Sequence, residues 1–251
     1  MSALLSIPDT AIGLAGLPSN VLMHVPDGFI NLPTSAIVGA IAAVAVGLSI
    51  RGARHELDER TAPLAGLVAA FIFAVQMLNF PVAAGTSGHL LGAALAAILV
   101  GPYTAVLCVT VVLMVQAIFF ADGGLTALGL NVINMAVVGT VVAWFVFKGI
   151  RAITPKSRTG VLISTAVAAF VAVPAASLAF VLEYAIGGTT DVPIGTVMTA
   201  MVGTHVLIGI GEAIITTLTV GAVLATRPDL VYGARDLRPQ LKVRASDAIT
   251  A

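Results

Sequence analysis

Two histidines in polar segments are the chain's best candidates for binding a transition metal. His24 lies in the string Met-His-Val-Pro-Asp-Gly-Phe at residues 23–29, and His89 ends the string Gly-Thr-Ser-Gly-His at residues 85–89. Imidazole nitrogens suit a borderline late transition metal such as Co, Ni, Cu or Zn. Glycine and small polar residues let a loop turn tightly and approach a ligand closely. The two strings predict a metal site if the fold brings them together.

Two further ionisable residues, His205 and Glu212, lie seven positions apart in an apolar stretch, which places them on one face of a helix. Ionisable groups at membrane depth are costly and suggest function. The alternative is that they satisfy each other or neighbouring helices. The sequence contains no Gly-x-x-x-x-Gly-Lys-Ser/Thr, His-Glu-x-x-His, Gly-x-Ser-x-Gly or Cys-x-x-Cys motif. It therefore lacks the signatures of ATP hydrolysis and of the commonest membrane enzymes.

The elements that carry these residues are expected to be membrane helices. Hydrophobic residues make up 59% of the 251 and charged residues 10%, with a mean hydropathy of +1.07. Such a composition indicates an integral membrane protein, and the net charge of zero gives no sign of a nucleic-acid partner. About twenty apolar residues cross a bilayer. We expect an all-α bundle of about seven transmembrane helices, near residues 34–50, 62–80, 88–100, 103–120, 129–148, 159–183 (kinked at Pro174) and 195–225.

The basic residues predict how this bundle is oriented. All twelve Lys and Arg fall within residues 51–60, 148–158 and 227–244. Because Lys and Arg collect at the cytoplasmic ends of membrane helices, we expect the N-terminus outside and residues 227–251 to form a cytoplasmic tail. His24 and His89 then lie on the outer face. His55, in the first basic loop, is expected to be a solvated surface residue.

Several strings in the chain resemble the CbiM/NikM family. The resemblance is carried by residues 23–29, 76–81, 85–89, 120–129 and 203–212, together with Asn131 and Asn134, and it covers about residues 23–225. Members of this family are the substrate-binding membrane components of cobalt and nickel energy-coupling-factor (ECF) transporters. The resemblance thus implies that Co(II) or Ni(II) is a transported ligand and that the chain has no catalytic cofactor.

The resemblance also implies a set of metal ligands. These are the α-amine of Met23, the main-chain nitrogen and Nδ1 of His24, and His89. Four such nitrogens in fused chelate rings favour the square-planar field of Ni(II) and low-spin Co(II) over tetrahedral Zn(II). Met23 is internal in this sequence. Either the functional chain starts at Met23, or residues 1–22 are removed, or the site lacks its first ligand.

The segment before Met23 favours the first of these alternatives. Residues 1–22 contain no Lys or Arg, so they lack the basic region of a signal peptide. They also hold Pro8, Asp9 and Pro18, which argue against a membrane span. We therefore expect residues 1–22 to be an extension outside the functional chain, and a transmembrane domain at residues 23–226.

Other residues are expected to support the site or to bind partners. Side chains that either orient the metal-binding histidines or join helices are His205, Asn79, Gln76, Asn131 and Asn134. Glu212 is expected to be structural. Small residues on the first helix predict a docking face, with internal packing as the alternative: Ala36, Gly39, Ala40 and Ala43. The resemblance implies a transmembrane scaffold subunit, cytoplasmic ATPase subunits and a small accessory membrane subunit as partners.

Two other functions remain open at this point. A stand-alone secondary metal transporter needs charged coupling residues at the membrane midplane, where this sequence offers only His205 and Glu212. An intramembrane metalloenzyme needs three protein ligands, an open coordination position and a general base. The sequence favours a non-enzymatic capture subunit in the plasma membrane.

The predicted orientation is testable by cysteine labelling of intact cells. A cysteine placed at Thr189 should react with an impermeant reagent added from outside, because this loop lies on the side without basic residues. A cysteine at Lys156 should react only after the membrane is permeabilised. The reverse pattern would contradict an outward-facing metal site.

Overall fold

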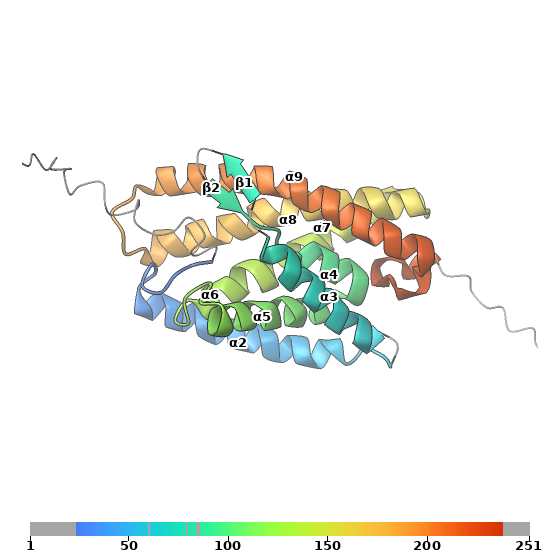
Figure 1. Ribbon diagram of the computed structural model, residues 1–251, viewed down its shortest axis with the longest axis horizontal. Coiled ribbons are helices and arrows are strands. Elements are labelled where there is room, and N and C mark those ends of the chain that lie inside the picture. The colour runs from blue at the N-terminus through green and yellow to red at the C-terminus, as the bar shows by residue number, and fades with distance from the viewer. Residues whose placement is uncertain (1–23, 60, 79, 84–85, 238–251) are drawn as a thin grey trace, which may run out of the picture.

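The computed structural model describes residues 24–59, 61–78, 80–83 and 86–237, which form a helical bundle (Figure 1). The elements in chain order are α2 (Leu32–Ala53), α3 (Thr61–Gln76), β1 (Phe80–Ala83), β2 (Thr86–Gly88), α4 (Ala93–Val100), α5 (Pro102–Phe119), α6 (Leu128–Asn131), the π-helix η2 (Val132–Val138), α7 (Gly139–Ile153), α8 (Arg158–Gly187), α9 (Ile194–Thr226) and the short η3 (Pro228–Leu230) and η4 (Tyr232–Leu237).

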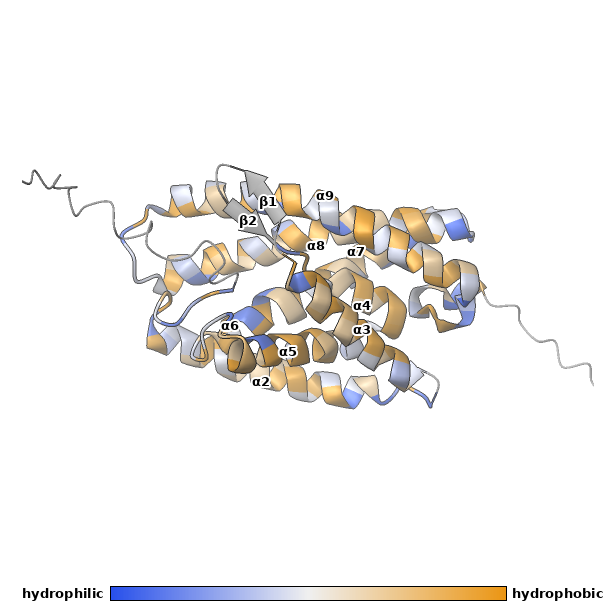
Figure 2. Cartoon of the chain, in the orientation of Figure 1, coloured by the Kyte–Doolittle hydropathy of each residue, from blue (hydrophilic) through white to orange (hydrophobic). Residues whose placement is uncertain are grey.

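Five helical stretches of the described chain are long and apolar enough to cross a membrane. They are Leu32–Ala53, Pro102–Phe119, Leu128–Ile153, Arg158–Gly187 and Ile194–Thr226, and the third of them joins α6, η2 and α7 end to end. Large apolar side chains such as Ile37, Ile41, Leu207 and Ile214 point outward from the bundle. Apolar residues run along the helices in Figure 2. The chain is therefore a multi-pass membrane protein, as predicted.

The predicted third span, residues 88–100, differs most from the structure. Only Ala93–Val100 is helical, and all eight residues of this helix are buried. Eight residues rise about 12 Å, which is far short of the roughly 30 Å hydrocarbon core. Gly92, with φ +78°, stands before the helix, and Gly101, with φ +102°, stands after it. Helix α4 is therefore buried and too short to cross a membrane by itself.

A short β-hairpin replaces the end of the predicted second span. Helix α3 stops at Gln76, and β1 pairs antiparallel with β2, with Phe80 opposite Gly88. The hairpin lies beside α9 (Figure 1). The expectation of an all-α protein is therefore correct for the bundle and wrong for this connection, where Pro81 cannot continue a helix.

Helix α8 packs along α9 and continues through Pro174 without ending. Proline has no amide hydrogen, so the carbonyl of Phe170, four residues earlier, lacks its usual helical partner. Gly209 of α9 lies against this carbonyl, where a side chain would come within 2.9 Å of the oxygen. The glycine lets the two helices approach closely at the expected kink.

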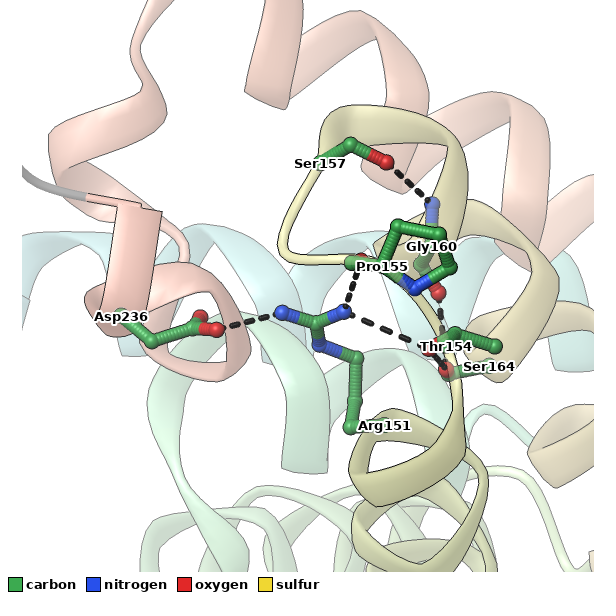
Figure 3. A network of polar contacts seen from close by, with 7 residues as sticks. All are labelled: Arg151, Thr154, Pro155, Ser157, Gly160, Ser164 and Asp236. Carbon is green, nitrogen blue, oxygen red and sulfur yellow. Dashed lines mark hydrogen bonds and ion pairs between the residues drawn. The ribbon is translucent and has the colours of Figure 1, made fainter.

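The described parts of the three basic segments lie at one end of the bundle, on the right of Figure 1. At this end Arg151 is ion-paired with Asp236 and donates to the carbonyl of Pro155 at 2.9 Å (Figure 3). Ser157 accepts the amide of Gly160 at 3.2 Å and so begins α8. The contact between Arg151 and Asp236 joins the second basic segment to the third.

The first basic segment is joined to the same end through Glu56. Its carboxylate is buried at the start of α5, where it accepts the amides of Tyr103 at 3.1 Å and Thr104 at 2.7 Å. A carboxylate suits this position because the first amides of a helix have no intrahelical partner. The carbonyl of Glu56 accepts from Arg235 at 3.4 Å. The loop after α2 therefore binds both the start of α5 and the segment after α9.

Candidate metal site

His24 is carried by a segment that crosses the opposite end of the bundle from the basic residues. On one side, Asn31 donates its amide to the carbonyl of Gly187 at 2.7 Å, and Thr189 donates to that of Phe29 at 3.1 Å. On the other side, the amide of Gly124 donates to the carbonyl of Val25 at 2.9 Å. The segment 24–31 is thus tied both to the end of α8 and to the loop that follows α5.

Asn131 of α6 fixes the backbone next to His24. Its side-chain oxygen accepts the amide of Val25 at 3.0 Å, and its side-chain nitrogen donates to the carbonyl of Val25 at 3.3 Å. Asn131 is itself 4% exposed, so these bonds are shielded from water. This pairing sets the direction in which the chain leaves His24.

Asp27 anchors the same segment two residues later. Its carboxylate accepts the amide of Thr126 at 2.7 Å and also the hydroxyl of that residue. The hydroxyl bond to Thr126, ahead of the other contacts, lowers the pKa of Asp27. Asp27 therefore stays ionised as the partner of this loop.

The His24 side chain is buried, and one of its ring nitrogens lies close to a carboxylate. Its Nδ1 lies 3.2 Å from a carboxylate oxygen of Asp122, and its Nε2 has no hydrogen-bond partner among the described residues. Gly123, with φ +92°, lies against the ring, where an added side chain would come within 2.9 Å of the His24 Cβ. The turn at residues 122–124 is therefore shaped by the close approach of His24.

His89 faces His24 from the loop that precedes α4. The two ring centroids are 5.0 Å apart with the planes tilted by 58°. The Nδ1 of His89 lies 2.8 Å from the carbonyl of Leu90 and must donate to it, because a carbonyl only accepts. This bond fixes the tautomer and leaves the lone pair of Nε2 free to bind a metal. Sequence segments 65 residues apart (89 minus 24) thus present two imidazoles to one place.

The main chain that follows His89 is held by two buried side chains. Glu212 of α9 accepts the amides of Leu91 and Gly92, each at 2.8 Å, and Gln76 of α3 donates to the carbonyl of Leu91 at 2.8 Å. Glu212 and Gln76 are each 1% exposed. The sequence analysis expects Glu212 to be structural. The structure adds that its partner is the loop that carries His89, a candidate ligand.

The two histidines open into a cavity of about 370 Å³. His205 of α9 lines its wall, and the Nδ1 of this histidine bonds the carbonyl of Met201, one helical turn earlier, at 2.7 Å. The other walls are mostly apolar and come from the following residues: Phe29, Leu91, Met135, Val173, Phe180 and Ile208. Two imidazoles at the edge of an apolar cavity resemble the common form of a small-ligand site.

Asn134 lines the same cavity from the π-helix η2. Its side-chain nitrogen donates to the carboxylate of Glu183 on α8 at 2.7 Å. The sequence analysis selected Asn134 but missed Glu183. The available signal was an acidic residue at the end of the apolar run 159–183. Short π-helices often occur at functional sites, because the extra residue per turn redirects side chains.

The structure does not bring all the predicted residues together. Among the described residues, no three His, Cys, Asp or Glu side chains group closely enough to hold a metal ion. Met23, Asn79 and residues 1–22 lie outside the described residues. The main-chain and terminal nitrogens that the family resemblance implies as ligands stay a prediction.

The predicted docking face on α2 is divided by the fold. Ala36, Ala40 and Ala43 are exposed on the surface of the bundle. Gly39 instead packs within the chain, because a side chain on Gly129 of α6 would collide with its backbone. The exposed residues remain a candidate face, and Gly39 serves the contact between α2 and α6.

Comparisons with known proteins identify the family. Residues 24–230 match the CbiM family, described as the cobalt uptake substrate-specific transmembrane region. The chain belongs to the CbiM family. It is therefore a membrane component of cobalt or nickel transport, and the predicted recognition is confirmed.

Relatives and a solved structure named as metal transporters match most of the chain. A putative metal transport protein of Haloquadratum walsbyi is 40% identical over 210 residues, which are 84% of this chain and 94% of that protein. A putative fused nickel transport protein NikMN of Archaeoglobus fulgidus is 37% identical, over 83% of this chain and 68% of its own length. A crystal structure of a transition metal transporter has a TM-score of 0.74 at 28% identity and covers 86% of this chain and 100% of that chain.

Replacing His89 with alanine should lower the affinity for Ni(II) and Co(II) by about 10-fold to 1000-fold, since each ~1.4 kcal/mol of lost ligation is tenfold. Isothermal titration of purified protein measures this directly. His55→Ala is the control, because this histidine lies at the basic end of the bundle and should leave the affinity unchanged. Equal affinities of the His89 variant and the unchanged protein would contradict the site.

The pH dependence of His89 gives a second test. Burial, and then the neighbouring His24, lowers the pKa of His89 from 6.5 to about 4. Between pH 6.5 and 4 the His89 ring is protonated in the unfolded chain and neutral in the folded chain. The free energy of unfolding should therefore fall as the pH drops from 6.5 toward 4. Histidine NMR signals, assigned with His89→Ala, should show the ring neutral until the pH approaches 4. A ring that titrates near 6.5 would contradict this.

Proposed function

We propose that this chain is the substrate-capture component of an ECF-type importer for Co(II) or Ni(II). The observation that carries the proposal is the pair of imidazoles of His24 and His89, 5.0 Å apart at the edge of a cavity. Family membership supports the transport role, and nitrogen ligands support the choice of metal. The chain recognises the ion, and its partners supply the energy.

The proposed ligands are the amine of Met23, the main-chain nitrogen and Nδ1 of His24, and Nε2 of His89. The first two nitrogens close a five-membered chelate ring on the metal, and the main-chain nitrogen and Nδ1 of His24 close a six-membered one. In the structure Nδ1 faces Asp122. The ring therefore gives up this contact when the metal binds, and the displaced carboxylate stays close enough to offset the charge of the ion.

The surroundings of the site support tight and selective binding. Asn131 holds the backbone beside His24, and the carbonyl of Leu90 fixes the tautomer of His89. Groups already held in their binding geometry lose little entropy when the ion arrives. The cavity walls beside the two histidines are mostly apolar, so few other groups compete with the nitrogen ligands for the ion.

We place the site on the outer side of the membrane, because the basic segments gather at the opposite end of the bundle. The exposed Ala36, Ala40 and Ala43 of α2 form the proposed docking face for a transmembrane scaffold subunit. Cytoplasmic ATPases and a small accessory membrane subunit complete the proposed transporter. One relative is named as a fused protein and extends beyond the matched region, which supports a multi-part system.

A chain that starts at Met23 should bind metal more tightly than the 251-residue chain. A terminal amine can anchor the metal so that the amide of His24 loses its proton, whereas a peptide nitrogen at Met23 has no lone pair to offer. The two chains should be compared by titration with Ni(II) under identical conditions. N-terminal sequencing of the titrated protein should accompany the measurement. Equal affinity, with residues 1–22 shown intact, would remove the amine from the ligand set.

Uptake measurements separate the proposed role from its rivals. Proteoliposomes with this chain alone should bind Co(II) or Ni(II) without concentrating it. Addition of the scaffold and ATPase subunits should make uptake depend on ATP. Uptake by the chain alone, driven by an ion gradient, would instead indicate a secondary transporter. Turnover of a substrate with bound metal and no uptake would indicate a metalloenzyme.

A further inference from the structure

Glu212 is a buried carboxylate near the middle of a long membrane helix. It is the nineteenth of the 33 residues of α9, about 27 Å from the start of a helix about 50 Å long. Only 1% of the residue is exposed. Ionisable groups at such depth are rare and costly, and they persist where they have a specific partner.

The main-chain partners of Glu212 belong to the loop that carries His89, and Thr216, one turn further along α9, also bonds its carboxylate. The two carboxylate oxygens accept the amides of Leu91 and Gly92, two and three residues after His89. Gln76 donates to the carbonyl of Leu91. Together with the two bonds to Glu212, this makes three hydrogen bonds of 2.8 Å to adjacent peptide units. Gly92 has φ +78°, and a side chain there would come within 2.8 Å of Ile72. The loop is thus held by side chains of two helices, α3 and α9.

We propose that Glu212, with Gln76, is a positioning residue for metal capture: it holds the His89 loop in the geometry in which the ring meets His24. This inference rests on the proposed function and identifies residues that tune the affinity of the same site. Glu212 does not touch the metal. It acts through the main chain, because the peptide units after His89 set the position from which its ring extends.

A simpler role for Glu212 is to cap the start of α4. The chain contains a matched example of such a cap, because Glu56 accepts the amides of Tyr103 and Thr104 at the start of α5. Both carboxylates are buried and both accept two main-chain amides. The amides of Tyr103 and Thr104 lie in the first turn of α5, whereas those of Leu91 and Gly92 come just before Ala93, the first residue of α4. Glu56, however, lies at the basic end of the bundle, away from the histidines. The two residues therefore separate capping from positioning.

The experiment compares Glu212→Gln with Glu56→Gln. Both variants are made in the chain, starting at Met1 or at Met23, that binds Ni(II) more tightly. A glutamine oxygen can accept one amide, but its NH₂ group meets the other amide donor to donor. Both variants should melt at a lower temperature than the unchanged protein. Only Glu212→Gln should also lower the Ni(II) affinity of the folded protein, by about 10-fold to 100-fold, as for other partners of metal ligands.

Two further measurements keep the test decisive. The Ni(II) absorption spectrum of Glu212→Gln should shift toward that of His89→Ala, while Glu56→Gln keeps the unchanged spectrum. If Glu212→Gln does not fold, Gln76→Leu replaces it, since this change removes the third hydrogen bond without altering a charge; it should lower the affinity in the same direction.

The outcomes distinguish this inference from the proposed function. Unchanged affinity and spectrum in Glu212→Gln, or in Gln76→Leu as its replacement, with a loss in His89→Ala, would overturn the positioning role and leave the metal site intact. Unchanged affinity in His89→Ala would overturn the proposed site and the positioning role with it.

Discussion

Main-chain polar groups inside a membrane bundle must find partners within the protein, and this constraint shapes the site. A helix satisfies its own backbone, but a loop at membrane depth does not. The segment that carries His89 is not helical, since α3 ends at Gln76 and α4 begins only at Ala93. Just after His89, Glu212 accepts the amides of Leu91 and Gly92, and Gln76 donates to the carbonyl of Leu91. The non-helical backbone that presents His89 thus depends on two polar residues in otherwise apolar helices.

The other half of the site is built by the same rule at the bundle's end. The segment with His24 is not helical, and Asn131 satisfies both the amide and the carbonyl of Val25. Gly123 and Gly124 let the loop after α5 approach this segment without side chains in the way. Each candidate ligand therefore lies on irregular backbone that a buried polar side chain holds in place.

The two ends of the molecule differ in the residues that they carry. At one end, segments that bear histidines surround a cavity. At the other end, the ion pair of Arg151 with Asp236 joins the end of α7 to the segment after α9 (Figure 3). The bond from Arg235 to the carbonyl of Glu56 joins that segment to the loop after α2. The separation also matches the charge distribution expected of a protein with one end in the cytoplasm.

The sequence by itself determined the membrane class, the approximate place of the long helices and the histidines worth testing. Those inferences depend on local properties, namely apolar run length, charge clustering and motif wording. It also led to the CbiM family, because the strings around His24 and His89 are long enough to be specific. It did not reveal that residues 88–100 form a hairpin end and a short helix, since an apolar run looks the same whether lipid or protein surrounds it. The partners of Glu212 and Asn134 came from the tertiary structure alone, because their hydrogen bonds join residues 49 to 121 positions apart. Such contacts are decided by how helices pack, which local sequence does not encode.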